Sequence, residues 1–213
     1  MVTETIYQPE YRTSWAIVIG INAYAHASPL GFARQDAEAV SSVIIEKHGF
    51  QQEKVRLLLD ASATRNAIMC AFLSLATGDI HVDDRVIIFF AGHGHTRTGK
   101  RGEIGYLVPA DGDPTDLSTL IRWDELTRNS ELISAKHVLF IMDACYGGTA
   151  ITRTLAPGSQ RFLKDMLQRY SRQVLTAGKA DELVADSGGP RPGHSIFTGH
   201  FLEALEGKAA NGD

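Results

Sequence analysis

The sequence contains few cysteines, no long apolar run and no large excess of charge of either sign. Its 213 residues include two cysteines, Cys70 and Cys145, which are too few for a disulfide framework. The uninterrupted apolar runs, such as residues 67–73 and 86–91, are far shorter than the roughly 20 residues that cross a bilayer. Lysine and arginine number 21 against 25 acidic residues, with neither sign gathered into a run. These shortages argue against a disulfide scaffold, a membrane-spanning helix and a basic surface for nucleic acid.

The N-terminal residues also lack a targeting pattern. Residues 1–14 contain neither the basic nor the apolar segment of a secretion signal, so the cytosol is the expected compartment. Hydrophobic residues make up 44% of the chain, which is enough to fill one sizeable core. We expect a single domain over residues 1–213, with residues 1–14 as an N-terminal extension.

Strand-like and helix-like segments alternate along the chain. Apolar and β-branched runs predict strands at 15–21, 55–59, 85–91, 106–109, 137–142 and 174–177. Apolar residues at three- and four-residue steps predict helices at 32–48, after Thr64, at 123–129 and at 195–205. This alternation predicts an α/β fold with a mostly parallel central sheet flanked by helices. We expect Cys70, inside the second helix, to be a small buried side chain.

Two of the predicted strands run into glycine-rich segments. The strand at 85–91 is followed by GHGH (92–95), and the strand at 137–142 is followed by DACYGG (143–148). We expect the glycines to end the first of these strands and residues 96–103 to form a polar loop. Residues 149–171 are expected to form a long mobile loop. Functional groups in parallel α/β sheets collect beyond the carboxyl ends of strands, so both glycine-rich segments are candidate site segments.

These two segments carry the side chains of a cysteine–histidine pair. A thiolate at Cys145 can attack a carbonyl carbon, while an imidazole accepts the thiol proton and later protonates a leaving amine. The backbone N–H groups of Gly94 and Cys145 can hold the developing oxyanion, because glycine lets the main chain approach a substrate closely. His93 and His95 point to the same side of an extended chain, so spacing leaves both open as the cysteine's partner.

The amino-acid sequences of both segments closely resemble those of a known family. IIFFAGHGH and LFIMDACYGG are similar to the two catalytic blocks of caspase-like cysteine peptidases (clan CD, family C14), in the metacaspase and bacterial orthocaspase branch. The interval of 52 residues from His93 to Cys145 is close to the roughly 50 of caspases. Five further segments between about Trp15 and Leu205 resemble the family in the same order: AIVIGINAY, LGFARQDAEAV, GYLVPAD, VLTAGKADELVAD and HSIFTGHFLEAL.

The resemblance implies both a fold and an activity. The fold would be the caspase-like three-layer sandwich, and the activity that of a cysteine endopeptidase (thiol protease) acting through an acyl-enzyme. Cys145 would be the nucleophile. His93, which directly precedes glycine in the family's G-H-G pattern, would be the general acid/base. Such a dyad requires no cofactor and no metal, and no third catalytic residue is evident.

The resemblance also implies a substrate preference. Asp143, two residues before Cys145, stands where metacaspases have an aspartate in the pocket for the residue preceding the cut. Asp36 falls on another pocket acid of the same branch. Two carboxylates in one partly desolvated cleft favour a cationic side chain, so cleavage after Arg or Lys is expected. On the residues alone, Asp36 could instead complement a helix dipole and Asp143 could cap a turn.

Activation of such an enzyme raises two further expectations. Self-cleavage is expected in the region after Cys145, with Arg153 and Arg161 as the first candidates. The basic residues there are Arg153, Arg161, Lys164, Arg169 and Arg172. Some relatives are activated by calcium, and DGDPTD (111–116) is an acidic run, but its spacing is not that of an EF-hand loop. An ordinary solvated turn is the favoured interpretation of that run.

The resemblance further implies a regulated protease of a bacterial cell-death, signalling or defence pathway. Its partners would be a protein or peptide substrate with Arg or Lys at the cleavage site, with no nucleic acid and no membrane. A regulatory partner or fused domain is expected if the chain belongs to a longer multidomain protein. Two alternatives are a zinc hydrolase, with His93, His95 and Cys145 as metal ligands, and a non-enzymatic caspase-like module that senses or scaffolds.

Overall fold

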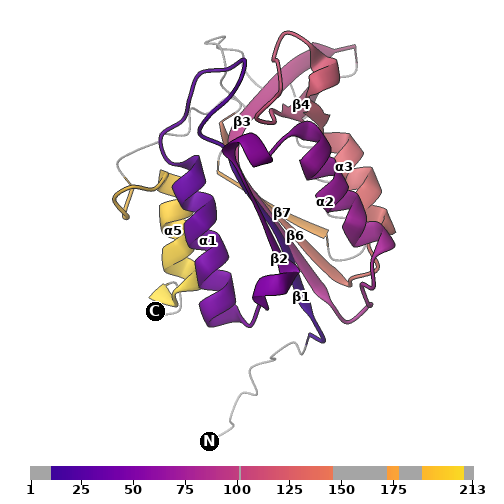
Figure 1. Ribbon diagram of the computed structural model, residues 1–213, viewed down its shortest axis with the longest axis vertical. Helices are drawn as coiled ribbons and strands as arrows, with labels where there is room; N and C mark the ends of the chain where they lie inside the picture. Colours follow the sequence, from indigo (N-terminus) through magenta and orange to yellow (C-terminus); the bar gives the residue numbers. More distant parts are fainter. Residues whose placement is uncertain (1–10, 101, 146–171, 178–188, 209–213) are drawn as a thin grey trace, which may run out of the picture.

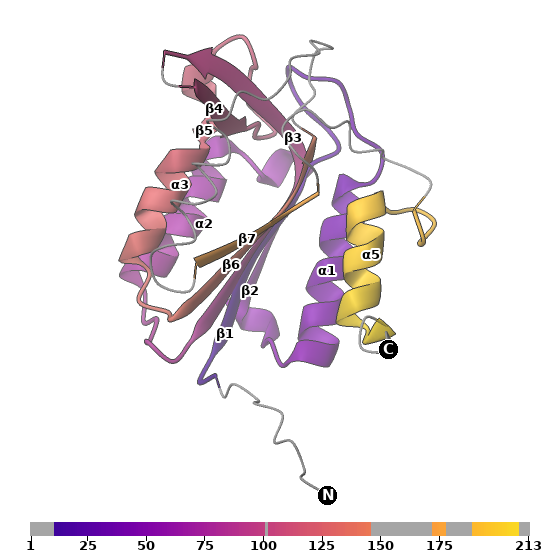
Figure 2. The same cartoon turned by 180° about the vertical axis from the view of Figure 1, so that it is seen from behind.

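A mostly parallel sheet lies between two helical layers in the computed structural model, which describes residues 11–100, 102–145, 172–177 and 189–208 (Figures 1 and 2). Five strands run parallel in the order β2-β1-β3-β6-β7. Their bounds are β1 Ser14–Gly20, β2 Val55–Leu59, β3 Arg85–Gly99, β6 His137–Cys145 and β7 Arg172–Thr176. Two antiparallel strands, β4 (Gly102–Leu107) and β5 (Ile121–Arg122), continue the sheet from β3. The predicted α/β class and mostly parallel sheet are confirmed.

Helices cover both faces of this sheet. Helices α1 (Ala33–His48) and α5 (Ile196–Leu205) lie side by side on one face, while α2 (Arg65–Thr77) and α3 (Trp123–Asn129) cover the other (Figures 1 and 2). Short 3₁₀ turns occupy Gln52–Lys54, Asp60–Ser62, Leu117–Thr119 and Ser130–Leu132. Within the residues that the structure describes, no helix is long and apolar enough to cross a membrane.

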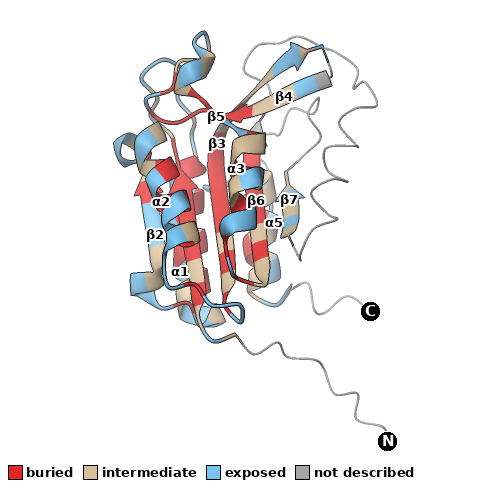
Figure 3. Cartoon of the chain, turned by 90° about the vertical axis from the view of Figure 1, so that its right-hand side faces the viewer, coloured by how far each residue is buried: buried red, intermediate tan, exposed pale blue. Residues whose placement is uncertain are grey.

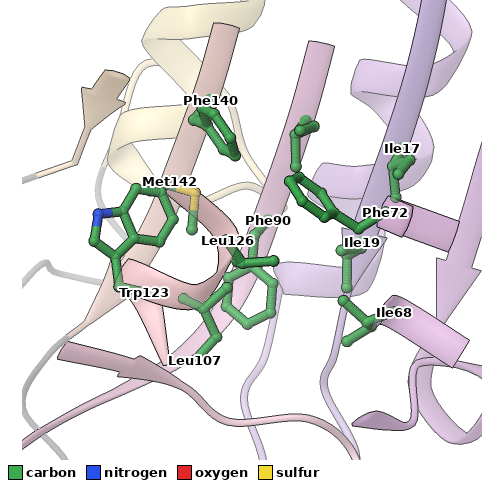
Figure 4. A pocket seen from close by; sticks show the side chains of 11 residues that line it. Ile17, Ile19, Ile68, Phe72, Phe90, Leu107, Trp123, Leu126, Phe140 and Met142 are labelled. Carbon is green, nitrogen blue, oxygen red and sulfur yellow. The ribbon is translucent and has the colours of Figure 1, made fainter. Parts of the chain in front are cut away.

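The buried strands divide their side chains between the two helical layers. In β1, Ile17 and Ile19 pack with α2 and α3, whereas Ala16 and Val18 pack with α1 and α5. The central strands are buried and the outer helix faces are exposed (Figure 3). A small cavity lies between the sheet and helices α2 and α3 (Figure 4). All of its lining side chains are apolar members of the core, so we interpret it as a packing gap and not as a substrate site.

Local signals in the sequence account for the helix ends. Helix α1 ends at Gly49, whose left-handed backbone (φ 71°) lets its N–H bond back to the last turn. The hydroxyl of Thr64 accepts a hydrogen bond from the first turn of α2, and the hydroxyl of Ser195 does the same for α5. The helices predicted at 32–48 and 195–205, and the Thr64 cap, are therefore confirmed to within one residue.

The expected break of the third strand at its glycines is wrong. Strand β3 continues through GHGH and forms a hairpin with β4, so most of the predicted loop at 96–103 is strand. Beyond His93, pairing with β4 replaces pairing with β6, and the backbone groups of β3 stay bonded. Gly92 instead allows Tyr24 to pack close to the main chain, because a Cβ at position 92 would lie 2.6 Å from the Tyr24 hydroxyl oxygen.

Two other expectations are corrected, and one lies beyond what is described. Strand β1 already includes Ser14, so the segment outside the sheet ends before residue 14. Cys70 is exposed, not buried. It lies two residues from both Ile68 and Phe72, which are buried, and therefore on the opposite side of α2. Residues 149–171, predicted as a long loop, lie outside the described residues.

Candidate active site

His93 and Cys145 are direct neighbours on adjacent parallel strands. They form the last pair of the β3–β6 register, which begins with Arg85 opposite His137. Both strands are buried between the helical layers, so a slip of one residue would turn apolar side chains to the wrong face. The register thus brings together two residues that are 52 positions apart in the sequence, at the carboxyl edge of the parallel sheet.

The loop that follows β1 holds the His93 side chain. Its Nε2 atom lies 2.8 Å from the carbonyl oxygen of Ser28. Because a carbonyl only accepts, Nε2 carries the proton in this contact, and Nδ1 is the acceptor nitrogen of the neutral ring. Tyr24 packs on the imidazole with ring centroids 4.7 Å apart, and its hydroxyl accepts a 2.8 Å hydrogen bond from the His93 N–H. Ser28 and Tyr24 thus orient the ring; neither was selected from the sequence, although Tyr24 ends the segment AIVIGINAY.

The second histidine has a different environment. His95 lies beyond the last β3–β6 pair and faces Tyr106 in the β3–β4 hairpin. Its Nε2 atom is buried and has no hydrogen-bond partner among the described residues. Burial, and secondarily the charge of Arg97, lowers the pKa of His95 below its ordinary value. The two histidines, which spacing could not separate, are separated by the sheet, since only His93 is in register with Cys145.

Gly94 occupies the position between these two histidines. It is buried and stands opposite Leu107 in the β3–β4 ladder. The Val108 N–H donates a 3.0 Å hydrogen bond to the His93 carbonyl. This bond shows that Gly94 and Leu107 form a non-hydrogen-bonded pair of the antiparallel ladder. The Gly94 N–H is therefore not directed to Leu107.

Asp36 and Asp143 meet in one buried polar cluster at the start of α5. Asp36, in the first turn of α1, is 1% exposed, and Asp143, near the end of β6, is 7% exposed. His194 Nδ1 lies 2.6 Å from Asp36 Oδ1, and the Ser195 N–H donates to Asp36 Oδ2 at 3.3 Å. The hydroxyls of Ser195 and Thr198 both donate to Asp143 Oδ2, at 2.5 Å for Thr198. Both acids therefore contact the start of α5, which is more than 50 positions away from each of them in the sequence.

The surroundings of Asp36, including Asp143, alter its ionisation. Burial raises the pKa of Asp36 from 3.8 to about 6, and the nearby charge of Asp143 acts in the same direction. The hydrogen bonds from His194 and Ser195 act in the opposite direction and favour the ionised carboxylate. Sequence reasoning missed His194, Ser195 and Thr198. The N-cap serine of a helix that starts at the carboxyl edge was the signal that could have found them.

The remaining predicted positions have separate surroundings. Each acid of the 111–116 run is hydrogen bonded within the chain: Asp111 to the Arg65 N–H, Asp113 to Thr115, and Asp116 to Ser118. Hydrogen bonds from Thr115 lower the pKa of Asp113. Among the side chains that the structure describes, no group of three or more His, Cys, Asp or Glu is arranged to hold a metal ion.

The predicted self-cleavage region is described only in part. Arg153 and Arg161 lie outside the described residues. Arg172, which the sequence reading counted with the same region, begins β7. Its guanidinium donates hydrogen bonds to the carbonyls of Ala135, Ser130 and Ile133. Arg172 is therefore a structural side chain in this fold and not a free cleavage point.

The fold and the paired strand ends define a caspase-like α/β protein, with histidine and cysteine at the carboxyl edge of its sheet. Residues 13–212 match the family model Peptidase_C14, described as the caspase domain. The chain therefore belongs to this family of cysteine peptidases, and the metacaspase branch fits it.

Individual relatives agree with this assignment. The chain is 25% identical over 201 residues to metacaspase-1 of Cryptococcus neoformans (strain JEC21), covering 82% of this chain and 40% of that protein. It is 22% identical over 197 residues to metacaspase-1 of Schizosaccharomyces pombe, covering 81% and 44%. The chain thus spans less than half the length of these relatives. The crystal structure of protein GSU0716 from Geobacter sulfurreducens shares the fold, with a TM-score of 0.65 at 20% identity over 91% of this chain and 82% of that one.

Proposed function

We propose that this chain is a cysteine endopeptidase that cleaves peptide bonds after Arg or Lys, with Cys145 as nucleophile and His93 as general acid/base. The observation that carries the proposal is the pairing of His93 with Cys145 at the last step of the β3–β6 register. Membership of the caspase-domain family supports the reaction class. The tether of His93 to the Ser28 carbonyl supports the choice of this histidine over His95.

In the proposed reaction, the Cys145 thiolate forms a bond to the substrate carbonyl carbon and a tetrahedral oxyanion results. The carbon–nitrogen bond then breaks as His93 donates a proton to the leaving amine, which leaves a thioester. A water molecule gives a proton to His93 and attacks the thioester carbon, the carbon–sulfur bond breaks, and the acid product departs, which restores the Cys145 thiolate and the protonated His93. The Ser28 carbonyl accepts from Nε2–H throughout, and this bond stabilises the imidazolium while Nδ1 exchanges the proton.

Backbone donors complete the proposed machinery. The N–H groups of Gly94 and Cys145 belong to residues at or next to the paired strand ends, where the oxyanion would form. The Gly94 N–H is directed to β6 and not to its hairpin partner Leu107, so it would have to leave the β3–β6 ladder to hold the oxyanion. Removing one oxyanion donor typically costs about 100- to 1000-fold in rate, so these positions would contribute strongly to catalysis.

The proposed preference for Arg or Lys rests on Asp36 and Asp143. These carboxylates belong to one cluster at the same edge of the sheet, and Asp143 is two residues from Cys145. A buried carboxylate attracts a cation more strongly than a solvated one does, because the surrounding dielectric is lower. Both carboxylates are buried in this conformation, so a substrate cation reaches them only after neighbouring parts of the chain move.

Regulation is part of the proposal. Arg153 and Arg161 remain the first candidates for self-cleavage, and calcium remains a candidate activator. A role in a bacterial cell-death, signalling or defence pathway would follow from such control.

A scan of fluorogenic peptides tests the function. Wild type should cleave peptides with Arg or Lys before the bond and should spare peptides with Asp there. Cys145→Ala should abolish cleavage, and His93→Ala should lower the rate by about 100-fold or more, which is the usual contribution of general acid–base catalysis. Cys70→Ala and His95→Ala are the matched controls, and both should keep most of the activity. Running each reaction with and without calcium addresses activation.

Three outcomes would contradict the proposal. Activity lost to a chelator but resistant to thiol alkylation would indicate the zinc hydrolase. A Cys145→Ala chain that equals wild type in every functional assay would indicate a scaffold. Cleavage only after Asp would overturn the assignment of the acid pair.

A further inference from the structure

The start of α5 contacts both buried acids of the cluster. Ser195 bridges them, since its N–H donates to Asp36 and its hydroxyl donates to Asp143. The neighbouring His194 adds a 2.6 Å contact to Asp36 and is itself 15% exposed. His194 and Ser195 lie just before α5, in a segment separate from the strand ends and from the elements that carry the two acids. Their arrangement around the acids therefore requires its own explanation.

We propose that His194 is a positioning residue of the specificity pocket, which holds Asp36 ionised and oriented for a cationic substrate side chain. The inference rests on the proposed function, because it takes Asp36 as a pocket acid. His194 would not touch the reacting atoms. It would act through Asp36, by donating its Nδ1–H to Oδ1 of that carboxylate.

The need for such a residue follows from the pairing of two acids. Two carboxylates in one buried site repel each other, so one of them tends to take up a proton. A protonated Asp36 would offer a substrate guanidinium no charge. The His194 contact opposes this proton uptake, and the direction of its effect on the pKa of Asp36 agrees. A carboxylate has about four acceptor positions, and His194 and Ser195 use two, which leaves capacity for a substrate cation.

Other charged groups around Asp36 do not substitute for His194 among the described residues. The groups that act on its ionisation are Asp143 from β6 and His194 itself. Strand β1, which packs against α1, has no titratable side chain. Arg34, on the same helix as Asp36, is paired with acids outside the cluster, and His93 on β3 is bonded to the Ser28 carbonyl. Among the described residues, loss of His194 would therefore leave Asp36 without its side-chain hydrogen-bond donor.

The test measures kcat and KM for an Arg peptide between pH 5.5 and 8.5 in wild type, His194→Ala and His194→Gln. In His194→Ala the pKa of Asp36 should rise, and a rise of about one unit from about 6 should increase KM about eightfold at pH 5.5 and about threefold at pH 6.5. The two KM values should become nearly equal at pH 8.5, where Asp36 is ionised in both proteins. Glutamine can still donate a hydrogen bond, so His194→Gln should recover part of the loss. The value of kcat should change little.

A matched control lies on α5, the helix that begins just after His194. His200 is 66% exposed and outside the cluster, so His200→Ala should leave the pH profile of KM unchanged. A KM increase in His194→Ala that is equal at every pH would overturn the inference, since a merely structural role gives that result. A lower KM at all pH values would also overturn it, because His194 would then be competing with the substrate cation.

A second measurement does not depend on cleavage. The carboxyl signal of Asp36, followed by NMR in the Cys145→Ala protein with and without His194→Ala, reports the pKa directly. An unchanged pKa in two folded proteins would overturn the inference even if Arg peptides are cut. Absence of cleavage of any peptide by wild type would instead defeat the proposed function, while the NMR titration would still decide whether His194 controls the ionisation of Asp36.

Discussion

Each end of the central sheet buries aspartate side chains, but the two ends differ in how many carboxylates meet there and in what surrounds them. At the amino end, Asp84 directly precedes β3 and is 1% exposed. One of its oxygens accepts from the Trp15 Nε1–H at 3.1 Å and from the His81 N–H at 2.9 Å. At the carboxyl end, Asp36 and Asp143 come from different elements and share the start of α5.

This contrast shows that burial of an acid does not by itself indicate a functional site. Asp84 is a single carboxylate that joins a turn to a tryptophan, as a structural hydrogen-bond acceptor does. Asp36 and Asp143 bring two like charges together, which opposes ionisation and needs compensation from His194 and Ser195. Proteins retain such an unfavourable arrangement where a site requires charge, and this one lies beside the His93–Cys145 pair.

The largest expected difference between the two ends is in activity. Asp143→Asn should lower kcat/KM for Arg peptides by about 30- to 1000-fold, mainly through KM, because truncating a buried charge pair costs about 2–4 kcal/mol. Asp84→Asn, at the other end, should change kcat/KM less than twofold. Steady-state kinetics of both variants checks this pair. Equal losses in the two variants would remove the functional distinction between the ends.

A smaller effect, on stability, should appear at the amino end. Asp84→Ala leaves the Trp15 indole N–H and the His81 backbone N–H, both in part-buried hydrogen bonds, without their acceptor, and the free energy of unfolding should fall by about 1–3 kcal/mol. Urea unfolding monitored by tryptophan fluorescence measures this change. The kcat/KM of the remaining folded protein should match wild type, and a selective loss of activity would indicate that Asp84 reaches the site.

The smallest expected effect is a pH-dependent gain in the free energy of unfolding when Asp36 is replaced, which is opposite in sign to the loss expected for Asp84→Ala. The pKa of Asp36 is about 6 in the folded chain, against an ordinary 3.8. The folded protein therefore binds more protons between these values, so the favourable contribution of Asp36 is present below about pH 4 and is lost as pH rises through about 6. Asp36→Asn should consequently be more stable than wild type at pH 8, by about 1–2 kcal/mol, and this gain should vanish near pH 4.

Urea titrations of both proteins at the two pH values measure that difference. The Asp84→Asn variant serves as the reference for an acid outside the cluster. A wild type that is more stable than Asp36→Asn at pH 8 would show that the contacts of the ionised carboxylate outweigh its desolvation.

Much of the fold was predictable because its signals are local. Apolar runs marked the buried strands, the alternation of elements marked the parallel sheet, and Thr64 and Gly49 marked helix ends. The prediction failed at β3, where glycines were read as a strand end. Whether a glycine ends a strand depends on what lies across from it, and here β4 supplies a pairing partner and Tyr24 needs the space beside Gly92.

The residues of the candidate site also divide into those that sequence motifs indicate and those that only contacts between distant segments reveal. His93, Cys145, Asp36 and Asp143 could be selected from their motifs. His194 was not selected, although it begins the segment HSIFTGHFLEAL and precedes the N-cap serine, because its contact with Asp36 spans 158 positions in the chain.

Residue order and chemistry alone specified the alternating elements, the family motifs and the side chains able to perform the reaction, because each of these depends on neighbours a few positions away. Tertiary structure alone decided which histidine stands beside the cysteine strand, which acids are buried together and which groups compensate their charge. Register, burial and the resulting shift in proton affinity arise from contacts between distant segments, and they come into existence only when the sheet and its helices have packed.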